Sequence, residues 1–170
     1  PPPHPPPPPP QHHTFYLSSA ASDVYKRQLQ DWAREKLPIY EFMDLTIQSA
    51  SEGSYKCLVP LSRNTGNHIN TVHAALQWAS AEILGGLVVL STRTDEKYVP
   101  VVKSLSIEFA RPALTDITSE AVFSTEQVDV MNTALESTGR FDFELPSLIR
   151  DSEGEIVARA LGQYAVRTMG

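Results

Sequence analysis

Apolar positions dominate the stretch 67–86, which carries a single acid, Glu82. Apolar residues on nearly every side predict a helix that is buried all round. Asn70 or Thr71 is a suitable N-cap, and the pair Gly85-Gly86 is expected to end the helix or to allow a close approach of another backbone. The pattern therefore predicts a central core helix over this range.

Alternating or β-branched patterns predict strands on both sides of this helix. Before it, residues 29–37 favour a short helix, and residues 51–54 favour a hairpin turn between two strands at 41–50 and 55–61. Residues 128–139 break the alternation and predict a loop or a short helix. The strands expected after the helix are 87–93, 103–109, 116–124, 141–145 and 156–167.

Two strands, one long helix and about five further strands define an α+β fold. With so few helices, the sheet must bury one face on the central helix. We therefore predict an antiparallel sheet of about six to seven strands wrapped around one long helix, within a single domain at 29–170.

Residues 1–28 have a different composition from the rest. Nine of the first ten residues are proline, which favours an extended, solvated segment without a core. Residues 18–28 resemble a translated sequencing adapter, so this segment is expected to be a non-native or disordered tail, with the natural N-terminus missing.

The composition narrows the function classes. A net charge of −6 without a basic cluster argues against nucleic acid as a partner. The apolar run at 83–90 is too short to span a membrane. Cys57 is the only cysteine, which excludes a disulfide framework and a cysteine-based zinc site, and it reads as a core residue. A cytoplasmic protein without a bound metal is expected.

The helix offers two chemical groups. Its first-turn amides, around residues 73–75, lack partners within the helix and can stabilise negative charge on an oxygen. Glu82, among apolar neighbours, is a candidate general base. His73 and Glu82 are nine positions apart, which places them about half a turn and roughly 13 Å from each other. One site using both groups therefore requires two subunits, with the acid contributed by the partner.

These residues resemble a known signature. Asn67, then His73-Ala74-Ala75, then Glu82 match in order and spacing the motif of hot-dog-fold thioesterases, in the branch of the phenylacetate-pathway and acyl-CoA thioesterases. Residues 106–113, which end in a Pro-Ala step, and residues 154–160 also resemble strands of that superfamily. The resemblance covers 39–167.

The resemblance implies a role for each residue of this motif. The backbone amide of Ala74 would polarise a thioester carbonyl, Glu82 of the partner would act as base or nucleophile, and Asn67 would orient the carbonyl or water. His73 belongs to the same catalytic group. Candidate substrate-binding residues are Ala75, His68, Lys103 and Arg111, with Arg93 as a further cation for the phosphates of coenzyme A.

The resemblance also implies the partners. The substrate would be an acyl or aryl thioester of coenzyme A, with no other cofactor, and the assembly a homodimer or a homotetramer built from two dimers. In this chain alanines replace the usual glycine pair, which shields the backbone at Ala74 and Ala75 and points to an uncharacterised branch.

Two alternatives stay open. A hot-dog hydratase or dehydratase places a histidine fourteen positions before its glutamate, as His68 stands before Glu82, although no proline occurs between Arg63 and Tyr98. The other alternative is a non-catalytic module that binds acyl thioesters, favoured by the loss of the glycine pair.

Overall fold

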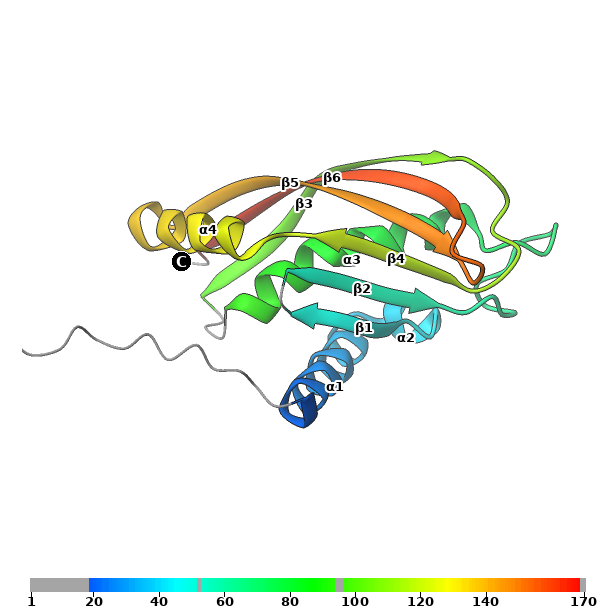
Figure 1. The fold of residues 1–170 in the computed structure, drawn as a ribbon, viewed down its shortest axis with the longest axis horizontal. Coiled ribbons are helices and arrows are strands. Elements are labelled where there is room, and N and C mark those ends of the chain that lie inside the picture. Colours follow the sequence, from blue (N-terminus) through cyan, green and yellow to red (C-terminus); the bar gives the residue numbers. More distant parts are fainter. Residues whose placement is uncertain (1–18, 52, 94–96, 169–170) are drawn as a thin grey trace, which may run out of the picture.

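The computed structural model describes residues 19–51, 53–93 and 97–168. A six-stranded antiparallel sheet curls around one long helix, α3 (Figure 1). The strands lie in the order β1-β2-β4-β5-β6-β3 across the sheet. This is the architecture that the pattern of apolar positions predicts. The strands are Thr46–Ser51 (β1), Ser54–Val59 (β2), Tyr98–Phe109 (β3), Ile117–Val122 (β4), Arg140–Asp151 (β5) and Ile156–Thr168 (β6).

The central helix α3 spans Ala74–Thr92. The predicted helix end at Gly85-Gly86 and the predicted strand at 87–93 are both wrong, because the helix continues through the two glycines. A short apolar run has no periodicity that separates a strand from a buried helix. Among the described helices, α3 is the one long and apolar enough to cross a membrane, yet half of that span is buried inside the protein. It is the core helix of this domain.

Two helices precede the sheet: α1 lies beside β1, and α2 packs against α1 (Figure 1). α1 spans Ser19–Lys36 and α2 spans Pro38–Phe42, so the first strand begins later than predicted. The domain boundary expected at residue 28 falls inside α1, whose Tyr25 donates a hydrogen bond to the carbonyl of Leu90. Residues 1–18 of the expected tail lie outside the described residues.

A fourth helix, α4, spans Thr125–Thr138, so the helix alternative predicted for 128–139 is correct and the helix begins three residues earlier than expected. Its N-terminus has a capping box: the Gln127 N–H donates to Ser124 Oγ, and the Ser124 N–H donates to Gln127 Oε1. Gly139, with φ of +70°, ends the helix in the left-handed conformation that favours glycine. The capping residues thus support a regular helix where the strand pattern stops.

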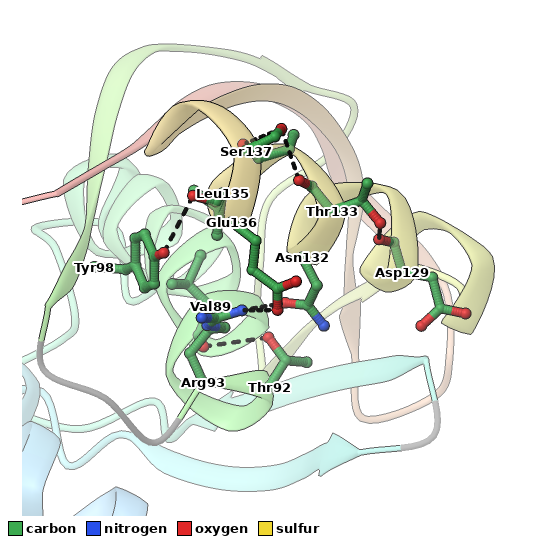
Figure 2. Close-up of polar contacts among 11 residues, drawn as sticks. Val89, Thr92, Arg93, Tyr98, Asp129, Asn132, Thr133, Leu135, Glu136 and Ser137 are labelled. Atoms are coloured by element: carbon green, nitrogen blue, oxygen red, sulfur yellow. Dashed lines mark hydrogen bonds and ion pairs between the residues drawn. The ribbon is translucent and has the colours of Figure 1, made fainter. Parts of the chain in front are cut away.

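Arg93, just after α3, holds α4 in place (Figure 2). Its guanidinium donates to Asn132 Oδ1 at 3.1 Å and lies 4.4 Å from the centroid of the Tyr98 ring. The Tyr98 hydroxyl donates to the carbonyl of Leu135 at 3.1 Å. These contacts cover the C-terminal end of α3, so the N-terminal end is the more accessible one.

The two edges of the sheet differ. At one edge, α1 packs against β1. At the other, β3 pairs with β6 along one side, and no described strand pairs with its other side. Val101 and Phe109 on this strand are exposed. A long edge strand with exposed apolar side chains is suited to pairing with another chain.

Candidate active site

A pocket of about 320 Å³ lies at the N-terminal end of α3. The loop 67–72, the first turn of α3 and the segment 109–113 after β3 form its walls. The Val72 N–H donates to the carbonyl of Ala113 at 2.9 Å, which joins the loop to the Pro-Ala step. The residues that line the pocket are Asn67, Ile69, Thr71, Val72, Ala74, Gln77, Phe109, Ala110, Arg111, Pro112 and Ala113.

The start of α3 leaves one backbone amide available. His73, and neither Asn70 nor Thr71, is the N-cap, and its Nδ1 accepts from the Ala75 N–H at 3.1 Å. The carbonyl of His73 accepts from the next two amides of the helix. The Ala74 N–H has no hydrogen-bond partner among the described residues, and Ala74 is exposed at the pocket wall. The structure therefore presents one unpaired donor at the positive end of the helix dipole.

Asn67 lines the same pocket, but its side chain also supports the loop. Its Nδ2 donates to Thr71 Oγ1 at 2.8 Å, and its Oδ1 accepts from the N–H groups of Ile69 and Thr71, each at 3.1 Å. Both lone-pair directions of Oδ1 are occupied, while Nδ2 retains one further hydrogen. Asn67 can thus donate to a ligand oxygen, but its carbonyl is committed to holding the loop.

Glu82 lies on α3 outside the pocket lining. It is eight residues after Ala74, which is about 12 Å along the helix axis. The carboxylate is half-buried, and its Oε2 accepts from the hydroxyl of Tyr40 on α2 at 2.5 Å. The hydroxyl of Tyr164 donates to the backbone carbonyl of Glu82 at 3.1 Å. Within one chain, the structure therefore keeps the acid and the unpaired amide apart, as the spacing predicts.

Burial controls the protonation of the groups beside Glu82. Desolvation, together with the negative charge of Glu82, raises the pKa of the Tyr40 and Tyr164 hydroxyls far above the usual value. Burial also raises the pKa of the Cys57 thiol to about 12. At neutral pH all three groups are therefore protonated, and the tyrosines act as hydrogen-bond donors.

The predicted substrate-binding residues separate into two groups. Arg111 lines the pocket, where it forms a surface ion pair with Glu155 at 2.9 Å. Ala75 is exposed in the first turn of α3, and His68 is exposed in the preceding loop, but neither lines the pocket. Lys103 is on β3 and pairs with Asp142 instead.

Arg93, the further cation considered for the phosphates, does not line this pocket. It follows the C-terminal end of α3, at the opposite end of the helix from the pocket, where it contacts α4. Of the three cations considered from the sequence, Arg111 is the one in the pocket wall.

The structure adds pocket residues that the sequence motif does not include. Gln77 is buried, and its Nε2 donates to the carbonyl of Val72 at 2.9 Å, while its Oε1 has no hydrogen-bond partner among the described residues. Phe109 contributes an exposed aromatic ring at the end of β3. The helical spacing of Gln77 from Ala74 could have identified the first, since residues three apart share a helix face. Within the described residues, no group of three or more His, Cys, Asp or Glu side chains is placed to hold a metal ion.

Solved structures share this fold. PA5026 from Pseudomonas aeruginosa, a protein of unknown function and probable thioesterase, is 26% identical, with a TM-score of 0.75 over 84% of this chain and 96% of that one. OLEI01261 from Chlorobaculum tepidum, also of unknown function, is 21% identical, with a TM-score of 0.77 over 87% and 97% of the two chains.

Thioesterase SAV0944 from Staphylococcus aureus is a more distant neighbour. It is 13% identical, with a TM-score of 0.63 over 76% of this chain and 98% of that one. Its structures include variants in which a glutamine, or a glutamate fifteen positions later, is replaced by alanine. These likenesses confirm the predicted hot-dog fold.

No curated protein matches the chain. A family model does: the domain of unknown function DUF4442 matches residues 26–166, which is most of the chain and includes the helix, the pocket and all six strands except the last two residues of β6. The chain therefore belongs to the DUF4442 family and has the hot-dog fold of thioesterase-like proteins.

Proposed function

We propose that this protein is an acyl-CoA thioesterase whose active site is shared between two subunits. The observation that carries the proposal is the unpaired N–H of Ala74 in the wall of a 320 Å³ pocket at the start of α3. Hydrolysis of a thioester passes through a tetrahedral intermediate with negative charge on the former carbonyl oxygen. A fixed N–H donor at a helix N-terminus stabilises that charge.

A second subunit would complete the site. One side of α3 is not fully covered by the sheet, since Ala75 is exposed and Trp78, Ala79, Glu82 and Gly86 are half-buried at helical spacing. The open edge of β3 is available to pair with a second chain. A two-fold axis there would set the two α3 helices antiparallel. Glu82 of each chain would then approach the Ala74 amide of the other.

The chemistry requires one acid and one donor. The carbonyl oxygen of the thioester accepts from the Ala74 N–H, and Glu82 of the partner subunit removes a proton from water as the water oxygen attacks the carbonyl carbon. The tetrahedral intermediate then collapses, the carbon–sulfur bond breaks, and the sulfur takes the proton from the carboxyl group. The products are a carboxylic acid and free thiol. In an alternative route, the Glu82 carboxylate itself attacks the carbonyl carbon and displaces the thiol, and water then hydrolyses the resulting anhydride.

The coenzyme A part of the substrate would leave the pocket along its outer wall. Arg111 can meet a phosphate there, and the Phe109 ring offers an apolar surface beside it. Lys103 is further along β3, where a longer ligand could reach it. No cofactor beyond the coenzyme A of the substrate takes part in this scheme, and the setting that fits it is the cytoplasm.

The spacing in SAV0944 supports the assignment. The two residues replaced in its structures are fifteen positions apart, which is also the separation of Asn67 and Glu82. By contrast, His68 is exposed and absent from the pocket wall, so its position gives no support to a hydratase.

A thiol-release assay over short, medium, long and aryl acyl-CoAs tests the proposal. We expect hydrolysis of at least one class, lowered about a hundredfold or more by Glu82→Gln, with fold and dimer retained. Glu120→Gln is the matched control, because Glu120 is an acid on β4 that pairs with Lys56 and Arg150. Hydration of an enoyl-CoA without thiol release, or saturable binding without turnover, would overturn the proposal.

A further inference from the structure

The hydroxyl of Tyr40 is the one hydrogen-bond donor to the Glu82 carboxylate among the described residues. Its oxygen lies 2.5 Å from Glu82 Oε2, and the two residues come from different helices, α2 and α3. The Tyr40 side chain is 5% exposed, so water competes little for this contact. A short hydrogen bond from a neutral donor to a carboxylate is among the stronger kinds.

The sequence around Tyr40 fixes its position. Pro38 starts α2 with the φ angle that a helix requires, and Met43 just after α2 is fully buried. Arg34 on α1 donates twice to the carbonyl of Leu45, at 3.0 and 2.7 Å, which closes the turn behind α2. The position of the Tyr40 hydroxyl is therefore fixed by packed helices and does not depend on a flexible loop.

Among the described residues, no other polar group near Glu82 donates a hydrogen bond to its carboxylate. The Tyr164 hydroxyl donates to the backbone carbonyls of Ala81 and Glu82, so it does not reach the carboxylate. The Cys57 thiol donates to the carbonyl of Ser80. Burial raises the pKa of all three groups, which stay protonated at neutral pH. The second carboxylate oxygen, Oε1, has no partner among the described residues and is available to a water molecule.

We propose that Tyr40 is a positioning residue, which fixes the Glu82 carboxylate so that Oε1 can act as the base in the partner's site. The inference rests on the proposed thioesterase function and adds a residue outside the thioesterase-like motif. A donor to Oε2 stabilises the charged carboxylate and orients its other oxygen. Loss of the donor should therefore lower turnover more than binding.

Tyr40→Phe tests this inference, because it removes the hydroxyl and keeps the ring. We expect kcat to fall about tenfold with KM changed little, which is the size expected for a hydrogen bond to a charged group. A purely structural tyrosine would lower the melting temperature and leave kcat unchanged.

Two matched variants control for the loss of a buried hydroxyl. Tyr164→Phe removes the hydroxyl that donates to the backbone carbonyls of Ala81 and Glu82. Tyr98→Phe removes the hydroxyl that donates to the backbone carbonyl of Leu135 on α4. Both should keep kcat close to the wild-type value. A Tyr40→Phe protein that is folded by circular dichroism and has an unchanged kcat would overturn the inference. In that case a Glu82→Gln protein that is inactive would leave the thioesterase proposal standing, whereas an active one would reject that proposal itself.

Discussion

The ring of Tyr164 lies directly against Gly85 of α3. A Cβ placed on Gly85 would come within 2.2 Å of this ring, far closer than any real Cβ contact. The same ring would clash with a Cβ on Gly162, two residues earlier on β6. Gly85 therefore lets the sheet approach the helix in the interior of α3, where glycine would otherwise be unfavourable.

Gly85→Ala should destabilise the fold. The added methyl group has to displace the Tyr164 ring, and overpacking of this kind costs about 1–3 kcal/mol or more. Gly86→Ala is the matched control, because within the described part of its own chain nothing lies within 4 Å of its added Cβ. It should be neutral or stabilising by about 0.5–1 kcal/mol through helix propensity. Urea unfolding measures both, and equal stabilities of the two variants would contradict the packing.

Ala74→Pro should abolish hydrolysis and keep the helix. Ala74 is the first helical residue, a position where proline is well tolerated, and His73 before it has the extended conformation that proline requires. The change removes the unpaired N–H, so kcat should fall about 10²–10³-fold. Ala74→Gly retains the N–H and should retain activity. Full activity of the proline variant would show that another donor binds the carbonyl.

Cys57 should resist thiol reagents in the folded protein. The thiol is fully buried, and burial raises its pKa to about 12, so the reactive thiolate is scarce at pH 8. Labelling with a chromogenic disulfide should be slow in buffer and complete in denaturant. Fast labelling of native protein, with activity lost in step, would instead assign Cys57 a place in the chemistry.

Glu120 should make the stability depend on pH. Hydrogen bonds from Arg150, at 2.7 Å, and from Lys56, at 2.9 Å, hold the pKa of its carboxyl below the usual value. Because its pKa is lowered in the folded protein, the ionised Glu120 carboxylate stabilises the fold at pH values above its unfolded pKa of about 4.3. This stabilisation is lost as the pH falls.

Glu120→Gln should therefore narrow the difference in unfolding free energy between about pH 6 and pH 3. Glu155→Gln, which breaks the exposed pair with Arg111, is the comparison and should have little effect. Parallel pH dependences of the wild type and of Glu120→Gln would contradict the assignment.

The fold could be predicted because two different patterns of apolar residues stand side by side in the sequence. The alternation of Phe141, Phe143 and Leu145 indicates a half-buried strand, and the apolar run around Leu84 indicates a buried helix. The end of α3 could not be predicted, because Gly85 is required by the Tyr164 ring across the core and not by a helix terminus. That contact joins residues far apart in the chain and leaves no local pattern.

The candidate site could be predicted only in part, because some of its contacts join residues that no local pattern connects. Helix geometry places the Ala74 amide and Glu82 about 12 Å apart, and the structure places only the first of them at the pocket. The Tyr40 hydroxyl could not be assigned to Glu82 from sequence, because α2 falls where the sequence predicts the end of a helix at residue 37 and the start of a strand at residue 41. The commitment of the Asn67 carbonyl to its own loop depends on hydrogen bonds that no spacing specifies.

Mixing two inactive variants tests the shared site most directly. A Glu82→Gln chain retains the Ala74 amide, and an Ala74→Pro chain retains the acid. A mixed dimer therefore contains one intact site and one site that lacks both groups. After exchange of subunits at equal concentration, we predict recovery of about a quarter of the wild-type thiol-release activity, because half of the dimers are mixed. A mixture no more active than either variant alone would contradict a site built from two subunits.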